Sequence, residues 1–450
     1  MEANKKHYSG RQPQLITSSI WSQMESIVPY SEIELFIESL ECFDLSHLAT
    51  TKWQNHHEMM EKITLQAVSE AKSNVDEFVK ETLLSYEKVS VLVKESITIQ
   101  VWREKVLPKL KSLSSFHPSS LFPIYVVMFH EATCVNLLET ILFHEACCCS
   151  LADLSLDLLD YCVDNFNAYL CGNENEIVAV NNIWDDMEEQ ENKICFEIFL
   201  KCICIVQYLV DHYRSLPTAI LPRMLSTHDI PLLFTRILVQ SPWKRVKDGK
   251  HQRYMDGQWK TVSEEEVMKL SKHEGQIWMM LINVFLNPDV RQNYEIDSYR
   301  RNCILKLQAF LNEALLDQMP PLLELQRFLA HLGTSSAPFP TSSLLLEIMP
   351  EFKRNLVKIW NKKWKSLASH QANSVFNLTQ EELENKAKSL SNAYDLDKME
   401  TLLESPANCA ICGKVARKRC SKCKNEWYCS RDCQIKHWPK HKKACELVAS

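Results

Sequence analysis

Eight thiol and imidazole side chains near the end of the chain stand at spacings that suit metal binding. They form four pairs, Cys409-x2-Cys412, Cys420-x2-Cys423, Cys429-x3-Cys433 and His441-x3-Cys445. Zinc binds thiolate and neutral imidazole, and four such ligands close a tetrahedral structural site with no vacant position for a substrate. The four pairs therefore predict two structural zinc sites rather than a set of free or disulfide-bonded cysteines.

The spacing of the ligands also limits how they are held. A Cys-x2-Cys pair suits a tight turn, whereas ligands four residues apart lie on one face of a helix. Pro439 should end a helix near Trp438, so we expect the last four ligands on two short helices.

Two pairings of the ligands fit these spacings. In the sequential pairing, one zinc takes Cys409, Cys412, Cys420 and Cys423. In the interleaved pairing, one site consists of Cys409, Cys412, Cys429 and Cys433, and the other of Cys420, Cys423, His441 and Cys445. Spacing alone does not choose between them.

Aromatic and amide side chains flank the ligands, namely Trp427, Tyr428, Gln434 and Trp438. With them, the segment resembles the MYND family of zinc fingers, and every ligand of that pattern stands in its place. The resemblance implies the interleaved pairing, two structural Zn²⁺ ions and a protein-binding role. It further implies that a peptide partner contacts Ser421, Gln434 and Trp438, although Trp438 is equally suited to anchor the small core of the finger. His437, a rival to His441 as ligand, is interpreted as a solvated helix residue.

Two further pairs could in principle bind a third metal. His130 precedes Cys134 by four residues, and His144 precedes Cys148 by four. A metalloprotease helix needs histidine at both such positions around a glutamate. Both pairs lie in continuous apolar segments, where free cysteine is usually buried, so we interpret them as core residues.

The motifs of common enzyme classes are missing from the sequence. The 7 glycines permit no phosphate-binding loop, dinucleotide fingerprint or nucleophile elbow. MYND fingers also occur in SET-domain methyltransferases, but that fold is rich in strands, and its Asn-His-Ser-Cys-type motif does not occur here. We find no catalytic residues and predict a protein that is not an enzyme.

Composition predicts an all-α protein. The 7 glycines among 450 residues are far below the average usage of about 7%, which disfavours sheet-rich folds. The start of the chain does not resemble a signal peptide, and the sequence has 18 cysteines, which together favour a reducing cytosolic compartment. No run of eighteen uncharged apolar residues predicts a transmembrane segment.

Charge is spread unevenly along the chain. Residues 409–450 contain 11 Lys/Arg and 3 Asp/Glu, a balance of +8, whereas the whole chain carries −6. A basic segment suggests nucleic-acid contact. However, seven thiolates around two Zn²⁺ ions leave a charge of −3 to be offset, and the pI near 6.2 is not that of a typical DNA-binding protein. We therefore interpret the basic residues as charge compensation and consider a nucleic-acid partner unlikely.

The hydrophobic pattern predicts how the chain is organised. We expect a polar, poorly ordered N-terminus over 1–30, a helical body over 31–332, a Ser/Pro-rich linker over 333–343, a charged helical arm over 344–404 and the finger over 405–450. The cadence of turn, proline and helix at 228–238 is typical of an irregular armadillo or HEAT-like array without a clean repeat. Asp256-Gly257 predicts a small β-hairpin within it.

Four segments of the body (53–58, 122–132, 223–228 and 315–320) and the finger together are similar to a family of MYND-finger axonemal dynein assembly factors. This resemblance implies a cytoplasmic scaffold for preassembly of dynein arms. The implied partners are a leucine-rich-repeat assembly factor, heat-shock protein 90 with its co-chaperones, and dynein chains as clients. The cytoplasm is the expected location, with centriolar satellites, the centrosome and dynein assembly foci as further sites. The rival hypothesis is a nuclear corepressor or DNA-associated adaptor that uses the basic finger.

Overall fold

The computed structural model describes residues 28–73, 77–118, 120–171, 183–255, 257–334, 348–377, 409–412, 416, 418–420 and 427–448. The chain divides into two compact units, residues 1–384 and 385–450. The predictions for residues 1–27, for most of the linker and for residues 378–408 therefore lie outside the described residues.

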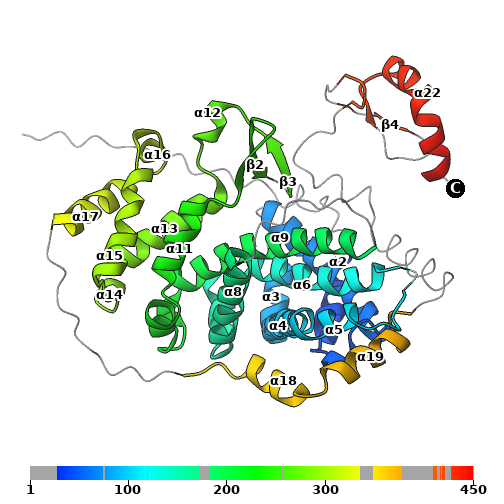
Figure 1. The fold of residues 1–450 in the computed structure, drawn as a ribbon, viewed down its shortest axis with the longest axis horizontal. Helices are drawn as coiled ribbons and strands as arrows, with labels where there is room; N and C mark the ends of the chain where they lie inside the picture. The colour runs from blue at the N-terminus through cyan, green and yellow to red at the C-terminus, as the bar shows by residue number, and fades with distance from the viewer. Residues whose placement is uncertain are drawn as a thin grey trace, which may run out of the picture. The chain divides into compact units, whose positions relative to one another are not determined.

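The body is helical, with one small sheet, and the predicted fold class is confirmed (Figure 1). In its first half the elements are α1 (Tyr30–Ser39), η2 (Leu45–His47), α2 (Thr51–Ser73), α3 (Phe78–Ser85), α4 (Val89–Lys105), α5 (Leu107–Lys111), α6 (Phe122–Ile141), α7 (Glu145–Ser150), α8 (Leu154–Cys171) and α9 (Ile183–Asp211). In its second half they are η3 (Tyr213–Ser215), α10 (Ile220–Pro222), η4 (Arg223–Thr227), α11 (Ile230–Gln240), α12 (Glu264–Val267), α13 (Lys272–Leu286), α14 (Pro288–Arg291), α15 (Ser298–Leu305), η5 (Lys306–Phe310), α16 (Glu313–Gln318) and α17 (Leu322–Thr334).

Helix α6 lies at the centre of the first half, where it packs against α2, α4 and α9 (Figure 1). It is apolar on nearly every side, and side chains such as Val127 and Leu137 are completely buried. Among the described residues, α6 is the one helix long and apolar enough to cross a membrane, and 67% of that apolar stretch is buried inside the protein. That burial is what a core helix shows.

The second half shows the predicted succession of turn, proline and helix, without a regular repeat. Asp229 takes a left-handed backbone conformation (φ 46°), and Pro231 lies in the first turn of α11. The preceding segment η4 is a π-helix. Helix lengths range from 3 residues in α10 to 29 in α9, so the array is irregular.

Three antiparallel strands form the sheet, β1 (Lys244–Lys247), β2 (Lys250–Met255) and β3 (Gln258–Thr261). Met255 pairs with Gln258, so the β2–β3 connection has two residues, as the Asp-Gly dipeptide predicts, although Asp256 itself lies outside the described residues. The sequence prediction missed β1. It pairs with β2 across a second Asp-Gly turn, in which Asp248 and Gly249 both have positive φ (52° and 69°).

Two helices that the sequence places in the charged arm pack on the body. They are α18 (Phe352–Trp360), which contacts α4 and α8, and α19 (Trp364–Ser374), which contacts α5. The completely buried Gln371 accepts a hydrogen bond from Trp102 Nε1 (2.9 Å) and donates one to the carbonyl of Leu45 (2.8 Å). Lys353 forms ion pairs with Asp164 and Glu104 at 2.8 and 3.1 Å. These contacts join α18 and α19 to helices far away in the sequence.

Candidate metal centre

The finger holds its first thiols with a short hairpin and the start of a helix. Strands β4 (Lys418–Arg419) and β5 (Trp427–Tyr428) pair, and α22 (Arg431–Val448) follows β5 closely. The backbone amide of Ala410 donates to the carbonyl of Trp427 (3.0 Å), which brings Cys409 beside the end of β5. Cys429 follows β5 directly, and Cys433 lies in the first turn of α22, where its amide donates to Ser430 Oγ (3.3 Å). Local pairing thus collects two cysteine pairs that are distant in sequence.

Four sulfurs converge at this point. The Sγ atoms of Cys409, Cys412, Cys429 and Cys433 all lie within 4.8 Å of one another. The measured separations are 3.4 Å for Cys412–Cys429, 3.6 Å for Cys429–Cys433 and 3.9 Å for Cys433–Cys412. Sulfurs bound tetrahedrally at about 2.3 Å from one zinc lie about 3.8 Å apart. The four thiols therefore fit a zinc ion, and their grouping is that of the interleaved pairing.

Ionisation of all four thiols would require a cation among them. Hydrogen bonds from the backbone, that of Cys429 first, lower the pKa of the Cys409 thiol to about 6. The neighbouring Cys412 and Cys433 sulfurs raise the pKa of Cys429 to about 12. Four adjacent thiols cannot all ionise against their mutual repulsion unless a positive charge lies among them. A divalent metal supplies that charge, and each sulfur then binds as thiolate.

The second predicted ligand set is described only in part. Cys420 and His441 are both buried in the finger. Cys420 belongs to a small core with Cys409, Ala416 and Tyr428, and the His441 ring lies edge-on to Tyr428 with centroids 6.4 Å apart. Cys423 lies outside the described residues, and Cys445 is placed only as part of α22. The described residues thus put two of the four ligands in the core of the finger.

The helix that carries the last ligands differs from the prediction. α22 runs from Arg431 to Val448 with Pro439 inside it, so the expectation of two short helices is wrong. An internal proline costs a helix about 3 kcal/mol through a lost N–H and a steric clash. Contacts made just before and after Pro439 offset this cost. Tyr428 Oη lies 2.9 Å from His437 Nδ1, and the rings of His437 and His441 stack with centroids 5.6 Å apart. His437, interpreted from the sequence as a solvated helix residue, is half-buried and also contacts Tyr428 and His441.

Two of the three residues predicted to contact a partner lie on α22. Gln434 is half-buried, and Trp438 is 38% exposed while its ring lies edge-on to His441 with centroids 6.0 Å apart. Ser421 lies outside the described residues. Ile435, which the sequence prediction did not single out, is 60% exposed and three residues before Trp438, hence on the same helix face.

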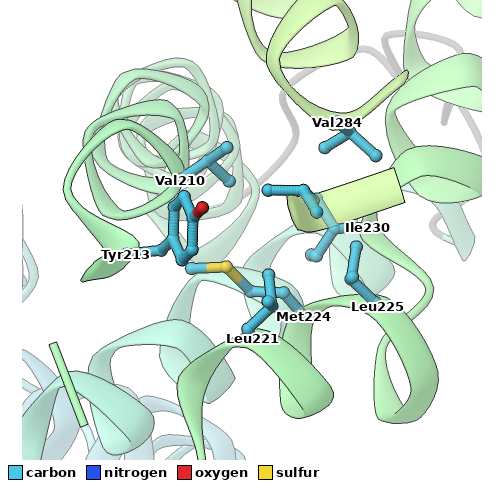
Figure 2. A pocket seen from close by; sticks show the side chains of 8 residues that line it. Val210, Tyr213, Leu221, Met224, Leu225, Ile230 and Val284 are labelled. Carbon is cyan, nitrogen blue, oxygen red and sulfur yellow. The ribbon is translucent and has the colours of Figure 1, made fainter. Parts of the chain in front are cut away.

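The body contains a small apolar pocket beside the π-helix (Figure 2). Its lining residues come from the end of α9 and from η3, α10, η4, α11, α13 and α14: Val210, Tyr213, Leu221, Met224, Leu225, Ile230, Val284 and Val290. Its empty space is about 250 Å³ including the part open to solvent, below the 300–1,000 Å³ usual for ligand sites. Apart from the Tyr213 hydroxyl, the lining side chains have no group suited to acid–base or nucleophilic chemistry.

Comparison with known proteins agrees with this geometry. The family model of the MYND finger matches residues 409–445. The zinc finger MYND domain-containing protein 10 homolog of Drosophila melanogaster is 33% identical over an alignment of 451 positions that covers 94% of this chain and 99% of the fly protein. Ubiquitin carboxyl-terminal hydrolase 19 of Arabidopsis thaliana is 38% identical over 58 residues, only 12% of this chain and 9% of that enzyme. No solved structure matches the chain.

Proposed function

Because the chain belongs to the family of zinc finger MYND domain-containing protein 10, we propose that it is a non-enzymatic scaffold for cytoplasmic preassembly of inner and outer axonemal dynein arms. In this role it is needed for motile cilia. The observation that carries the proposal is the length of the similarity, which covers 94% of this chain and 99% of the fly protein. A shared finger alone would not carry it, since the finger is also found on unrelated enzymes.

The proposed partners are proteins. They are a leucine-rich-repeat dynein assembly factor, heat-shock protein 90 with its co-chaperones, and dynein chains as clients. The cytoplasm is the proposed location, with centriolar satellites, the centrosome and dynein assembly foci as further sites. The helical body would present an extended surface to a client or chaperone while the finger docks a short peptide or a partner domain.

We assign peptide docking to the exposed face of the finger helix. Ile435 and Trp438 are exposed apolar side chains on one face of α22, with the half-buried Gln434 beside them. An aromatic anchor next to a polar side chain is typical of the centre of a protein interface. Ser421 completes the proposed contact set.

The finger would hold two structural zinc ions in this role. Cys409, Cys412, Cys429 and Cys433 bind the first, and Cys420, Cys423, His441 and Cys445 the second. The zinc ions stabilise the fold of a segment that is too small to have a large core. A zinc content clearly below two per chain would contradict this ligand assignment.

Co-purification from ciliated cells tests the proposed function. Wild type, Trp438→Ala and Cys420→Ala would be compared with Tyr299→Ala, a control that removes an aromatic ring 67% exposed on α15 of the body. We expect both finger variants to lose assembly-factor, chaperone and dynein partners that the Tyr299 variant retains. Retention of all these partners by both finger variants would contradict a docking role for the finger.

The same experiment separates the scaffold from a nuclear adaptor. The finger is basic, with 11 Lys/Arg against 3 Asp/Glu over residues 409–450. Binding to DNA through several cations weakens steeply as salt rises, whereas docking of a peptide on Trp438 depends on salt only weakly. Recovery of chromatin proteins in place of dynein-assembly partners, with steep salt dependence, would favour the nuclear role and overturn the scaffold.

A further inference from the structure

Three side chains from three helices meet in the core of the body. They are His56 of α2, Glu95 of α4 and His130 of α6. Nε2 of His56 lies 2.8 Å from Oε2 of Glu95, and Nε2 of His130 lies 3.1 Å from the same oxygen. The three atoms lie within 4.8 Å of one another, and each side chain is at most 5% exposed.

The donors in this cluster are those that zinc and related divalent ions prefer. Two imidazole nitrogens and one carboxylate oxygen form a known zinc ligand set, with bonds of about 2.0–2.2 Å. Donors bound to one ion at such lengths and at ordinary coordination angles lie about 2.8–3.4 Å apart. The two separations from Glu95, 2.8 and 3.1 Å, fall in this range.

A second pair of buried side chains continues the cluster outward. Nδ1 of His130 lies 2.9 Å from Nδ1 of His57, and Nε2 of His57 lies 3.5 Å from Oε1 of Glu61. The His57 and Glu61 side chains are only 3% and 6% exposed. Metal-binding histidines characteristically use their second ring nitrogen to donate a hydrogen bond that fixes the ring. Here the second nitrogen of His130 contacts His57, whose other ring nitrogen faces a carboxylate.

The contacts of this cluster are compatible with a metal at His130. With a metal on Nε2 of His130, the ring proton lies on Nδ1, which can donate to Nδ1 of His57, 2.9 Å away. Nε2 of His57 then carries a proton and faces the Glu61 carboxylate.

We propose that His56, Glu95 and His130 bind one divalent transition-metal ion, zinc for preference, in the core of the body. The two carboxylates of Glu95 and Glu61 balance the charge of the ion. Because the site is buried in the core, the ion would tie α2, α4 and α6 together, with one coordination position left open by the three protein ligands. This third site uses residues 39, 35 and 74 positions apart in sequence, unlike the closely spaced ligands of the finger.

Metal binding to the full-length chain tests the proposal without changing the core. All seven finger cysteines would be replaced by serine and His441 by alanine in a tag-free protein, leaving the body as it is. The protein would be stripped of metal, reconstituted with Zn²⁺ or Co²⁺ alone and analysed for metal content. We expect about one tightly bound ion per chain, with a raised Tm when the ion is present. A chain that retains no metal would overturn the proposal.

Cobalt gives a readout of the ligand type, because thiolate ligands produce a strong sulfur-to-cobalt charge-transfer band and imidazole–carboxylate ligands do not. The proposed site predicts weak visible bands alone in the finger-deficient chain. In that background, Glu95→Gln should remove the bound ion, while Glu70→Gln should retain it. Glu70 is a matched control because it is equally buried and also lies in this part of the body, on α2. Equal metal content in the two variants would overturn the assignment of Glu95.

Discussion

His273 should make the body sensitive to acid. It is the second residue of α13, two residues after the N-cap Ser271, whose side chain caps the helix together with Glu274. Its Nδ1 is buried with no hydrogen-bond partner in the described structure, and its ring lies 6.2 Å from that of Trp243. Burial, followed by repulsion from Lys272, lowers the pKa of the imidazole from 6.5 to about 4; Lys201 adds to this effect, and Glu139 and Glu274 oppose it. A positive charge near the N-terminus of a helix is also unfavourable.

The sign of the effect follows from the two states of the protein. The unfolded chain binds a proton at His273 near pH 6.5, whereas the folded chain does so only near pH 4. The stability contributed by neutral His273 is therefore complete above pH 6.5 and is lost as the pH falls from 6.5 toward 4. Between pH 7.5 and pH 5, this one group should reduce the free energy of unfolding by about 2 kcal/mol.

Urea unfolding followed by tryptophan fluorescence at pH 7.5 and pH 5 measures this loss. Other titrating groups contribute to the pH dependence of every variant, so the informative quantity is the difference between wild type and His273→Phe. The control is His251→Phe, which replaces an exposed histidine on β2. We expect the His273 variant to lose about 2 kcal/mol less than wild type between the two pH values, and the His251 variant to lose as much as wild type. Equal losses in wild type and His273→Phe would refute the reasoning.

Three further predictions concern other parts of the chain. Cys433→Ser should abolish zinc binding at the first site of the finger and unfold it while the helical signal of the body is retained, because the two units are separate; metal analysis and circular dichroism check this. Arg223→Leu should cost about 1.5–3 kcal/mol, since it removes two charge-assisted hydrogen bonds to Asp160 (2.6 and 2.7 Å), a carboxylate that keeps His228 as a partner. The double variant Arg223→Leu/Asp160→Leu should cost less than the single one in chemical denaturation, and a larger cost would contradict a paired charge. Gln371→Ala should cost about 2–3 kcal/mol, because it leaves the Trp102 N–H and the Leu45 carbonyl unpaired in the core; limited proteolysis should then cut α19 faster.

The four clustered thiols of the finger could be predicted from the sequence because the spacing within each pair is local. Cys409 and Cys412 share a turn, and Cys429 and Cys433 share the start of a helix, so each pair is visible in a window of five residues. The choice between pairings was not available from spacing, because it depends on strand pairing that returns Trp427 to the amide of Ala410. Pro439 misled the prediction because its cost is local, whereas the contacts of His437 and His441 that offset it are made in three dimensions.

The buried cluster of His56, Glu95 and His130 could not be predicted, because its residues are far apart in the sequence. His130 was paired with Cys134 by the rule for one helix face, but the partners of His130 in the structure come from α2 and α4. No window of sequence relates these helices. Strand β1, by contrast, could have been predicted, because Asp248-Gly249 has the same turn signal as Asp256-Gly257.

The packing of α19 against the first helices has a consequence for synthesis on the ribosome. Gln371 follows its partner Trp102 by 269 residues, so at usual translation rates of about 5–20 residues per second it emerges roughly 13–54 s later. Throughout that interval, the surface of α4 and α5 that α18 and α19 later cover is open on the nascent chain. Chains that terminate early, before Phe352, never cover it. Such products would leave Trp102 without its hydrogen-bond acceptor and the facing surface of α4 and α5 uncovered.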